Sequence, residues 1–207
     1  MQGIGGEPVT PPQDGLPLNT VNFPTATPSA GGGGTGGDAG GAHADTDAGT
    51  DGAIALGREL QTRSLLLLDK FAIGGGSRID YACMRRSDAL RDYIVLAASL
   101  QHMPLIAFGA MTDAQKLSFF ANLYNAFIVH ATCVLGVCED SPAARTAFFS
   151  GASGARYNIA GLSFSPDELE HGILRANTRH PYSTPDGQTT YLVAGDAREG
   201  LSISPDR

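Results

Sequence analysis

Residues 112–134 read TDAQKLSFFANLYNAFIVHATCV, and this stretch decides the fold. Thr112 and Gln115 have the spacing of a capping box, which predicts that a helix begins here. Apolar side chains cover most of its circumference at about 100° per residue, so the helix is predicted to be buried in a domain core. Gly136 follows and is expected to close the helix.

A narrow polar arc runs along this helix. Its members are Gln115, Ser118, Asn122, Asn125 and Cys133. A buried carboxamide must be hydrogen-bonded, since an unsatisfied one costs about 1–3 kcal/mol. We therefore expect Asn122 and Asn125 to hold the backbone of a neighbouring segment. The alternative is a pocket lined by both amides, with His130 at its edge as an acid/base group.

The sequence before and after this helix predicts further helices. Apolar residues at helical spacing indicate helices over residues 54–71 and 87–100, the second with Ser87 as its N-cap. A short helix is expected at 143–149. The glycine run at 74–76 is interpreted as a turn, because it fits neither a dinucleotide-binding nor a Walker pattern. No cofactor site is therefore predicted.

The C-terminal part predicts a small amount of β-structure. Residues 157–164 indicate a strand, a turn and a second strand. Ser165 and Glu168 form another capping box, which opens a helix ending near residue 176. A turn is expected at 185–187, and short strands at residues 191–193 and 201–203. The fold class predicted is α+β: one mostly helical domain with a small sheet.

The capped helix carries the remaining candidate residues. Glu168, His171 and Arg175 share a helical face at i, i+3 and i+7, which predicts a surface ion pair and a structural histidine. The alternative is a catalytic pair of Glu170 and His171. The sequence His-Glu-x-x-His is absent, so we expect no metal site here.

Residues 1–53 have a different composition from the rest of the chain. No Lys or Arg precedes Arg58, six acidic residues lie in this stretch, and 15 of the 27 glycines lie in residues 1–57. Such a segment buries too little apolar surface to offset the entropy lost on ordering. We predict a disordered tail at 1–53 and a domain at 54–207.

The charge and the cysteine content indicate which partners and which cellular compartment to expect. The net charge is −7, with no basic patch, so nucleic-acid binding is not expected. We see no signal peptide and no membrane-spanning run, which predicts a soluble, cytoplasmic or otherwise intracellular protein. Three cysteines at Cys83, Cys133 and Cys138 without framework spacing indicate free thiols rather than disulfides or zinc ligands.

Several segments together resemble one known family. They are Ser99–Gln101, Lys116–Ala126, His130, Tyr157–Gly161 and Leu169–Asn177. In order and spacing they are similar to the domain of unknown function 547 (DUF547) family, over residues 54–207. The resemblance implies helices around a small sheet and no accepted activity. It also implies a further strand with Cys-containing segments after Arg207, so we expect the domain to be incomplete at its C-terminus.

Two functions remain open at this point. The first is a non-catalytic or interaction domain with an unknown protein partner, in which the polar helix arc and the Glu/His face are structural. The second is a fragment of a thiol-dependent hydrolase or transferase whose cysteine lies in the absent segment. In that case His130 or His171 would act as the base, and Asn122 or Asn125 would orient it.

Overall fold

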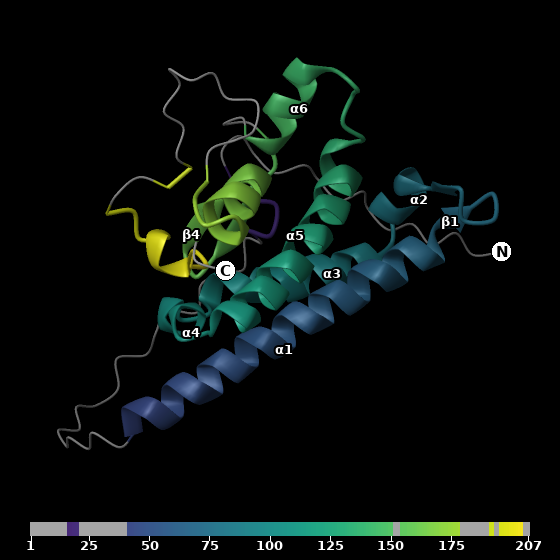
Figure 1. Cartoon of the computed structure of the whole chain (residues 1–207). Helices are drawn as coiled ribbons and strands as arrows, with labels where there is room; N and C mark the ends of the chain where they lie inside the picture. The colour runs from purple at the N-terminus through teal and green to yellow at the C-terminus, as the bar shows by residue number, and fades with distance from the viewer. Residues whose placement is uncertain (1–15, 21–40, 151–153, 179–190, 193–194, 205–207) are drawn as a thin grey trace.

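The computed structural model of the chain describes residues 16–20, 41–150, 154–178, 191–192 and 195–204, with residues 41–46 as backbone only. This part is mostly helical and contains two antiparallel hairpins (Figure 1). The predicted α+β class is therefore confirmed. The β-structure forms two separate two-stranded sheets rather than one.

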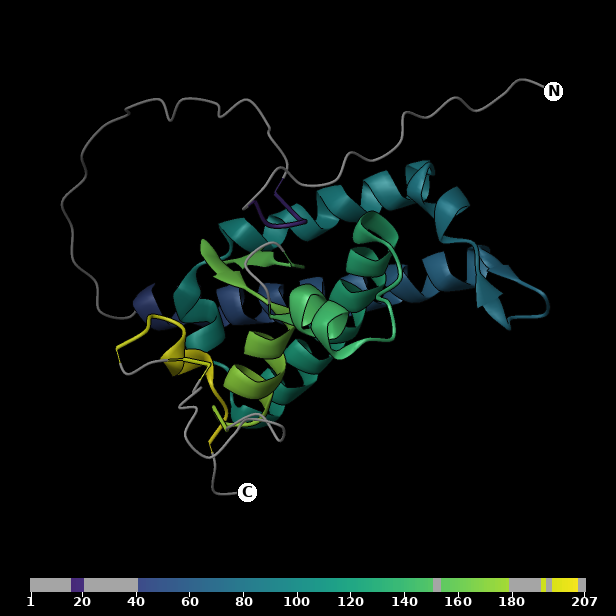
Figure 2. The same cartoon turned by 90° about the horizontal axis from the view of Figure 1, so that it is seen from above.

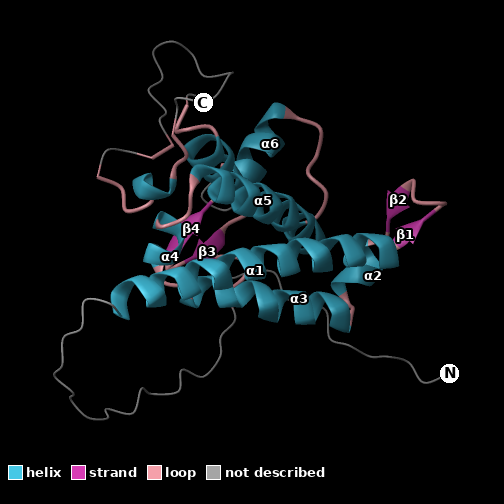
Figure 3. Ribbon diagram, turned by 60° about the horizontal axis from the view of Figure 1, so that its bottom comes forward, coloured by secondary structure: helices cyan, strands magenta, loops and turns pink. Residues whose placement is uncertain are grey.

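The elements follow one another in this order. The helices are α1 (Gly41–Lys70), α2 (Tyr81–Arg85), α3 (Asp88–Ala98), α4 (Leu105–Gly109), α5 (Asp113–Leu135) and α6 (Pro142–Phe149), with short 3-10 helices η1 (Ser99–His102) and η3 (Glu199–Leu201) and a π-helix, η2 (Glu168–Leu174). The hairpins pair β1 (Ala72–Ile73) with β2 (Arg78–Ile79) and β3 (Tyr157–Ile159) with β4 (Leu162–Phe164). Figure 3 shows β1–β2 projecting at one end of α1 and β3–β4 within the body of the molecule.

Local capping signals fix the start and end of α5. The backbone N–H of Gln115 donates to the Thr112 hydroxyl at 3.3 Å, and the Gln115 side chain accepts from the Thr112 N–H at 2.8 Å. Gly136 closes the helix with a φ of 101°, a conformation that favours glycine. The predicted capping box and helix end are confirmed, as is the Ser87 cap of α3.

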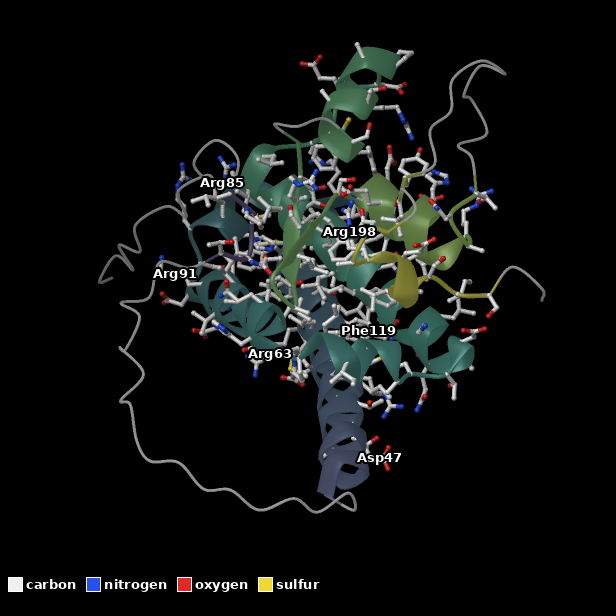
Figure 4. The ribbon with its side chains drawn as sticks, turned by 90° about the vertical axis from the view of Figure 1, so that its left-hand side faces the viewer. Asp47, Arg63, Arg85, Arg91, Phe119 and Arg198 are labelled. Carbon is white, nitrogen blue, oxygen red and sulfur yellow. The ribbon has the colours of Figure 1, made fainter. Side chains whose placement is uncertain are left out.

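The core forms where α1 crosses α5. The buried stripe of α1 consists of Thr50, Ala53, Gly57, Leu60, Ser64 and Leu67. Phe119 of α5, which is labelled in Figure 4, packs against Gly57, where an added Cβ would lie 2.5 Å from the Phe119 ring. The glycine therefore allows the two helices to approach closely.

Replacing Gly57 with Ala is expected to destabilise the fold by about 1–2 kcal/mol. The gain in helix propensity, about 1 kcal/mol, is smaller than the cost of displacing the buried Phe119 ring. Gly52→Ala is the matched control, because its nearest neighbour, the Met103 Cε, is 4.0 Å away and leaves room for a methyl group. Thermal unfolding should show a lower melting temperature for the first variant and an equal or higher one for the second. The reverse order would contradict this packing.

The described domain begins earlier than the composition suggests. Helix α1 starts at Gly41, so the expected boundary at 53/54 lies inside a helix. The reason is tertiary packing: the Thr50 hydroxyl donates to the Ala107 carbonyl at 3.0 Å, and Ala53 is fully buried. Residues 16–20 also pack onto the domain, whereas 1–15 and 21–40 lie outside the described residues.

Residues 157–164 form the predicted hairpin. Ala160 and Gly161 both have positive φ, 53° and 81°, as a tight two-residue turn requires. The strand predicted at 201–203 is wrong, because this segment leaves η3 and bonds to η2 through the Ile203 N–H instead. Residues 191–192 form a bend, and the turn predicted at 185–187 lies outside the described residues.

By length and composition α5 could cross a membrane, and among the described helices it alone meets this criterion. Its buried side includes Phe120, Leu123 and Phe127, each with no exposed surface. An apolar helix packed in this way is compatible with the core helix of a soluble protein.

Candidate functional site

The two asparagines of α5 do not take the positions expected from the polar arc. Asn125 is exposed and Asn122 is half-buried, so the expectation that both amides are buried and hold a neighbouring backbone is wrong. The buried side of α5 is the one that meets α1 and η2. Neighbouring elements, rather than the polarity of the helix, thus decide which side faces the core.

His130 lies in the core, 1% exposed, rather than at the edge of a pocket. Its Nδ1 is 2.7 Å from the Tyr157 hydroxyl, which is 3.2 Å from the Tyr93 hydroxyl. Burial lowers the pKa of His130 to about 3, so the imidazole is neutral at physiological pH. Its Nε2 has no hydrogen-bond partner in the described part of the chain. This arrangement joins α5, α3 and β3 through buried rings.

The structure brings Glu170 and His171 together with Tyr124 of α5. The Tyr124 hydroxyl donates to Glu170 Oε2 at 3.2 Å, and His171 Nε2 lies 3.9 Å from Glu170 Oε1. The His171 ring stacks on Tyr191, with centroids 4.9 Å apart. Only 4% of the His171 side chain is exposed, against 37% for Glu170.

The π-helix changes the pairing that was predicted on this helix. Glu168 does not face Arg175; instead Arg175 Nη1 lies 3.5 Å from Glu170 Oε1. A π-helix places residues five apart above one another, which brings positions 170 and 175 together. The i, i+3, i+7 face drawn from α-helical spacing is therefore wrong here.

Two tyrosine hydroxyls near Glu170 are held in their neutral form. Burial, and then the Glu170 carboxylate, raise the pKa of Tyr124 well above its usual range. Burial and the charges of Asp167 and Glu170 raise the pKa of Tyr191 to about 12. As a neutral phenol, Tyr124 acts as a donor to the carboxylate, so the cluster links α5 to η2.

Glu168 has a structural role that its capping box only partly reveals. The Ser165 N–H donates to Glu168 Oε2 at 2.7 Å, which confirms the predicted box. The same carboxylate also accepts from Arg156 Nη2 at 3.0 Å and Arg198 Nη1 at 2.7 Å. Arg198, which is labelled in Figure 4, in turn pairs with Asp196 and holds the pKa of that carboxyl below its usual range.

No pattern in the sequence indicates the roles of Arg156, Arg198 or Lys116. Lys116 is 7% exposed and donates from Nζ to the Gly200 carbonyl at 3.0 Å. Lys116 and Arg198 fasten residues 195–204 onto α5 and the β3–β4 hairpin, whereas Arg156 links the hairpin to Glu168. A single Lys or Arg side chain carries no sequence pattern that identifies a partner far away in the chain. These contacts can therefore be recognised only in the folded structure.

Two of the cysteines are held as thiols. The Asp80 carboxylate, by hydrogen bond and by charge, raises the pKa of Cys83. Burial raises the pKa of Cys133 to about 11. Neither environment activates a thiolate. Among the described residues no group of His, Cys, Asp and Glu side chains could hold a metal ion.

A groove of about 340 Å³ lies between the C-terminal half of α5 and α6. Its apolar lining includes Ile128, Val137, Phe148 and Phe149, and its charged lining consists of Glu139, Asp140 and Arg145. Val137 is 70% exposed, and α6 has no buried residue. Figure 1 shows α6 standing away from α1, at the top of the molecule.

Comparisons with known proteins add one finding. The model of the family described as "Protein of unknown function, DUF547" matches residues 108–205, a narrower range than the 54–207 expected from the motifs. No curated protein and no solved structure matches the chain. The match includes α5, the β3–β4 hairpin and η2, which carry most of the candidate residues. Residues 108–205 of this chain are therefore a DUF547 domain.

Proposed function

We propose that this chain is a non-catalytic interaction domain, and that the groove between α5 and α6 docks a basic, amphipathic segment of a partner protein. The observation that carries this proposal is the groove itself: Val137 is 70% exposed at its edge, and Ile128, Phe148 and Phe149 in its lining are only half-buried. Exposed apolar patches with a polar rim are typical of protein-binding surfaces.

The charge around the groove favours a basic partner. Glu139 and Asp140 are exposed on its rim, and neither forms an ion pair within the described part of the chain. Arg145 is the opposing charge in the lining, and it also lies near enough to Tyr124 to lower that residue's pKa. A helix with an apolar face and several Lys or Arg residues would satisfy both the lining and the rim.

The positions of the candidate catalytic residues support the same proposal. His130 is neutral in the core, Asn125 is exposed, and the Glu170 carboxylate already accepts from Tyr124. A catalytic role would require these three side chains to point at one reacting atom. We also propose an intracellular location, which is supported by Cys83, Cys133 and Cys138 being free thiols.

A designed peptide tests this proposal. The probe is a fluorescent helix with Leu at positions i, i+3, i+4 and i+7 and Lys elsewhere. We expect Val137→Ser with Phe149→Ser to weaken its binding at least about tenfold, because the apolar lining is lost. Leu66→Ser is the matched control, since Leu66 is 60% exposed on α1, away from the groove lining. Equal loss in both variants, measured by fluorescence anisotropy, would reject the groove.

Variants that remove the rim charges distinguish docking of the peptide in the groove from its non-specific binding to the surface. Glu139→Gln with Asp140→Asn should weaken binding and reduce its dependence on salt, because two rim charges are removed. A probe with Glu in place of Lys should not bind. Equal binding of the acidic and the basic probe would contradict the proposed partner chemistry.

A further inference from the structure

Residues 16–20 occupy a site on the folded domain although they are far from it in sequence. Leu18 is 7% exposed and belongs to the main hydrophobic core, and Asn19 is fully buried. The Thr20 N–H donates to the Pro17 carbonyl at 3.0 Å, so the segment is a tight turn. Figure 2 shows this segment, in purple, beside α3 and the β3–β4 hairpin.

Asn19 pairs with the backbone as a β-strand residue would. Its side-chain oxygen accepts from the Asn158 N–H at 2.7 Å, and its Nδ2 donates to the Asn158 carbonyl at 2.8 Å. One edge of β3 is already paired with β4, so the Asn19 amide completes the other edge. The same Nδ2 donates to the Ala97 carbonyl at the end of α3, at 2.9 Å.

The contacts of the segment are concentrated in a few residues. Besides Asn19, the Leu18 N–H donates to the Arg156 carbonyl at 2.7 Å, while the Leu18 side chain enters the core. Main-chain hydrogen bonds at a strand edge together with a buried side chain are one recurring way in which domains bind short peptides. A turn with Leu followed by Asn therefore carries the whole recognition pattern.

The docked segment also leaves polar atoms unsatisfied. The Thr20 hydroxyl and the Asn158 Oδ1 are buried without a hydrogen-bond partner in the described residues. Such atoms oppose docking, because each gives up its contacts with water. A covalent link offsets a weak intrinsic affinity by raising the local concentration, typically to about the millimolar range.

We propose that the edge of β3 that does not pair with β4, together with the C-terminal turn of α3, forms a peptide-binding site for a Leu-Asn turn. In this chain its own residues 16–20 occupy the site. The site accepts the same turn from a separate peptide when the internal copy is disabled. It is distinct from the groove between α5 and α6 and does not depend on it.

The experiment uses the full chain with Asn19→Asp and a fluorescent peptide of residues 13–22, QDGLPLNTVN. The Asp side chain cannot donate to Ala97 or Asn158, so the internal copy loses its site. We expect the variant chain to bind the peptide at least about tenfold more tightly than the unaltered chain, whose own segment competes. A peptide with Asp in place of Asn should bind about a hundredfold more weakly than the original.

Asn125→Asp is the matched control, because it makes the same change at an exposed position and should bind the peptide as weakly as the unaltered chain does. Should the Asn19→Asp chain unfold, the peptide is added during refolding and should restore a cooperative melting transition. The proposal is overturned by equal peptide binding to the unaltered and variant chains. Failure of about 1 mM peptide either to bind the folded variant or to rescue an unfolded one would overturn it too.

Discussion

Replacing Glu168 with Gln is expected to lower the free energy of unfolding by about 3 kcal/mol. The carboxylate is 17% exposed and lies between the guanidinium groups of Arg156 and Arg198. Gln keeps the size of the side chain but removes its charge and turns one acceptor into a donor. Both cations then lose a partner in a partly buried site, which is the costly way to break an ion pair.

Glu170→Gln is the matched control for this change. Glu170 lies on the same π-helix and also pairs with an arginine, but its side chain is 37% exposed. We expect a cost below about 1 kcal/mol, as for other exposed ion pairs. Urea unfolding of both variants measures the difference. Similar losses in the two variants would show that the network around Glu168 does not fasten residues 195–204 to the hairpin.

Acid is expected to lower the stability of the fold strongly, because His130 becomes protonated when the chain unfolds. Its pKa is about 3 in the folded chain and near 6.5 when exposed. The unfolded state therefore binds a proton first, and protonation favours unfolding. The contribution of neutral His130 to the free energy of unfolding is fully present above about pH 6.5. It is lost as the pH falls towards 3 and amounts to up to about 5 kcal/mol.

The variant His130→Phe isolates this contribution from that of the carboxyl groups. Its stability should fall less steeply than that of the unaltered chain between about pH 6.5 and pH 3, because no buried imidazole is left to protonate. His102→Gln, which removes an exposed imidazole from the same chain, serves as the matched control. Chemical unfolding at a series of pH values gives the two slopes. Parallel curves for His130→Phe and the unaltered chain would place His130 in contact with water.

Local signals in the sequence were sufficient to predict where several elements begin and end. The capping boxes at Thr112 and Ser165 depend on residues three positions apart, so the sequence contains all the information they need. The turn at Ala160-Gly161 is local in the same sense. The mostly helical fold follows from these starts together with the apolar periodicity between them.

The candidate site could be predicted only in part, because its contacts join distant segments. Glu170 and His171 were found as a pair, but their contacts with Tyr124 and Tyr191 depend on a π-helix that no local rule predicted. The composition of residues 1–53 gave no sign that Asn19 would fill the edge of β3. The hydrogen bonds of one buried amide can order a few residues within a segment whose overall composition disfavours folding.

Hydrogen exchange of the unaltered chain, with and without the basic amphipathic peptide, tests the proposed interaction domain most directly. The peptide should slow exchange at the C-terminal half of α5, at residues 137–140 and in α6, which together line the groove. Exchange on the exposed face of α1 should not change. Saturating binding of the peptide with protection confined to α1, or with no protection around the groove, would contradict the account.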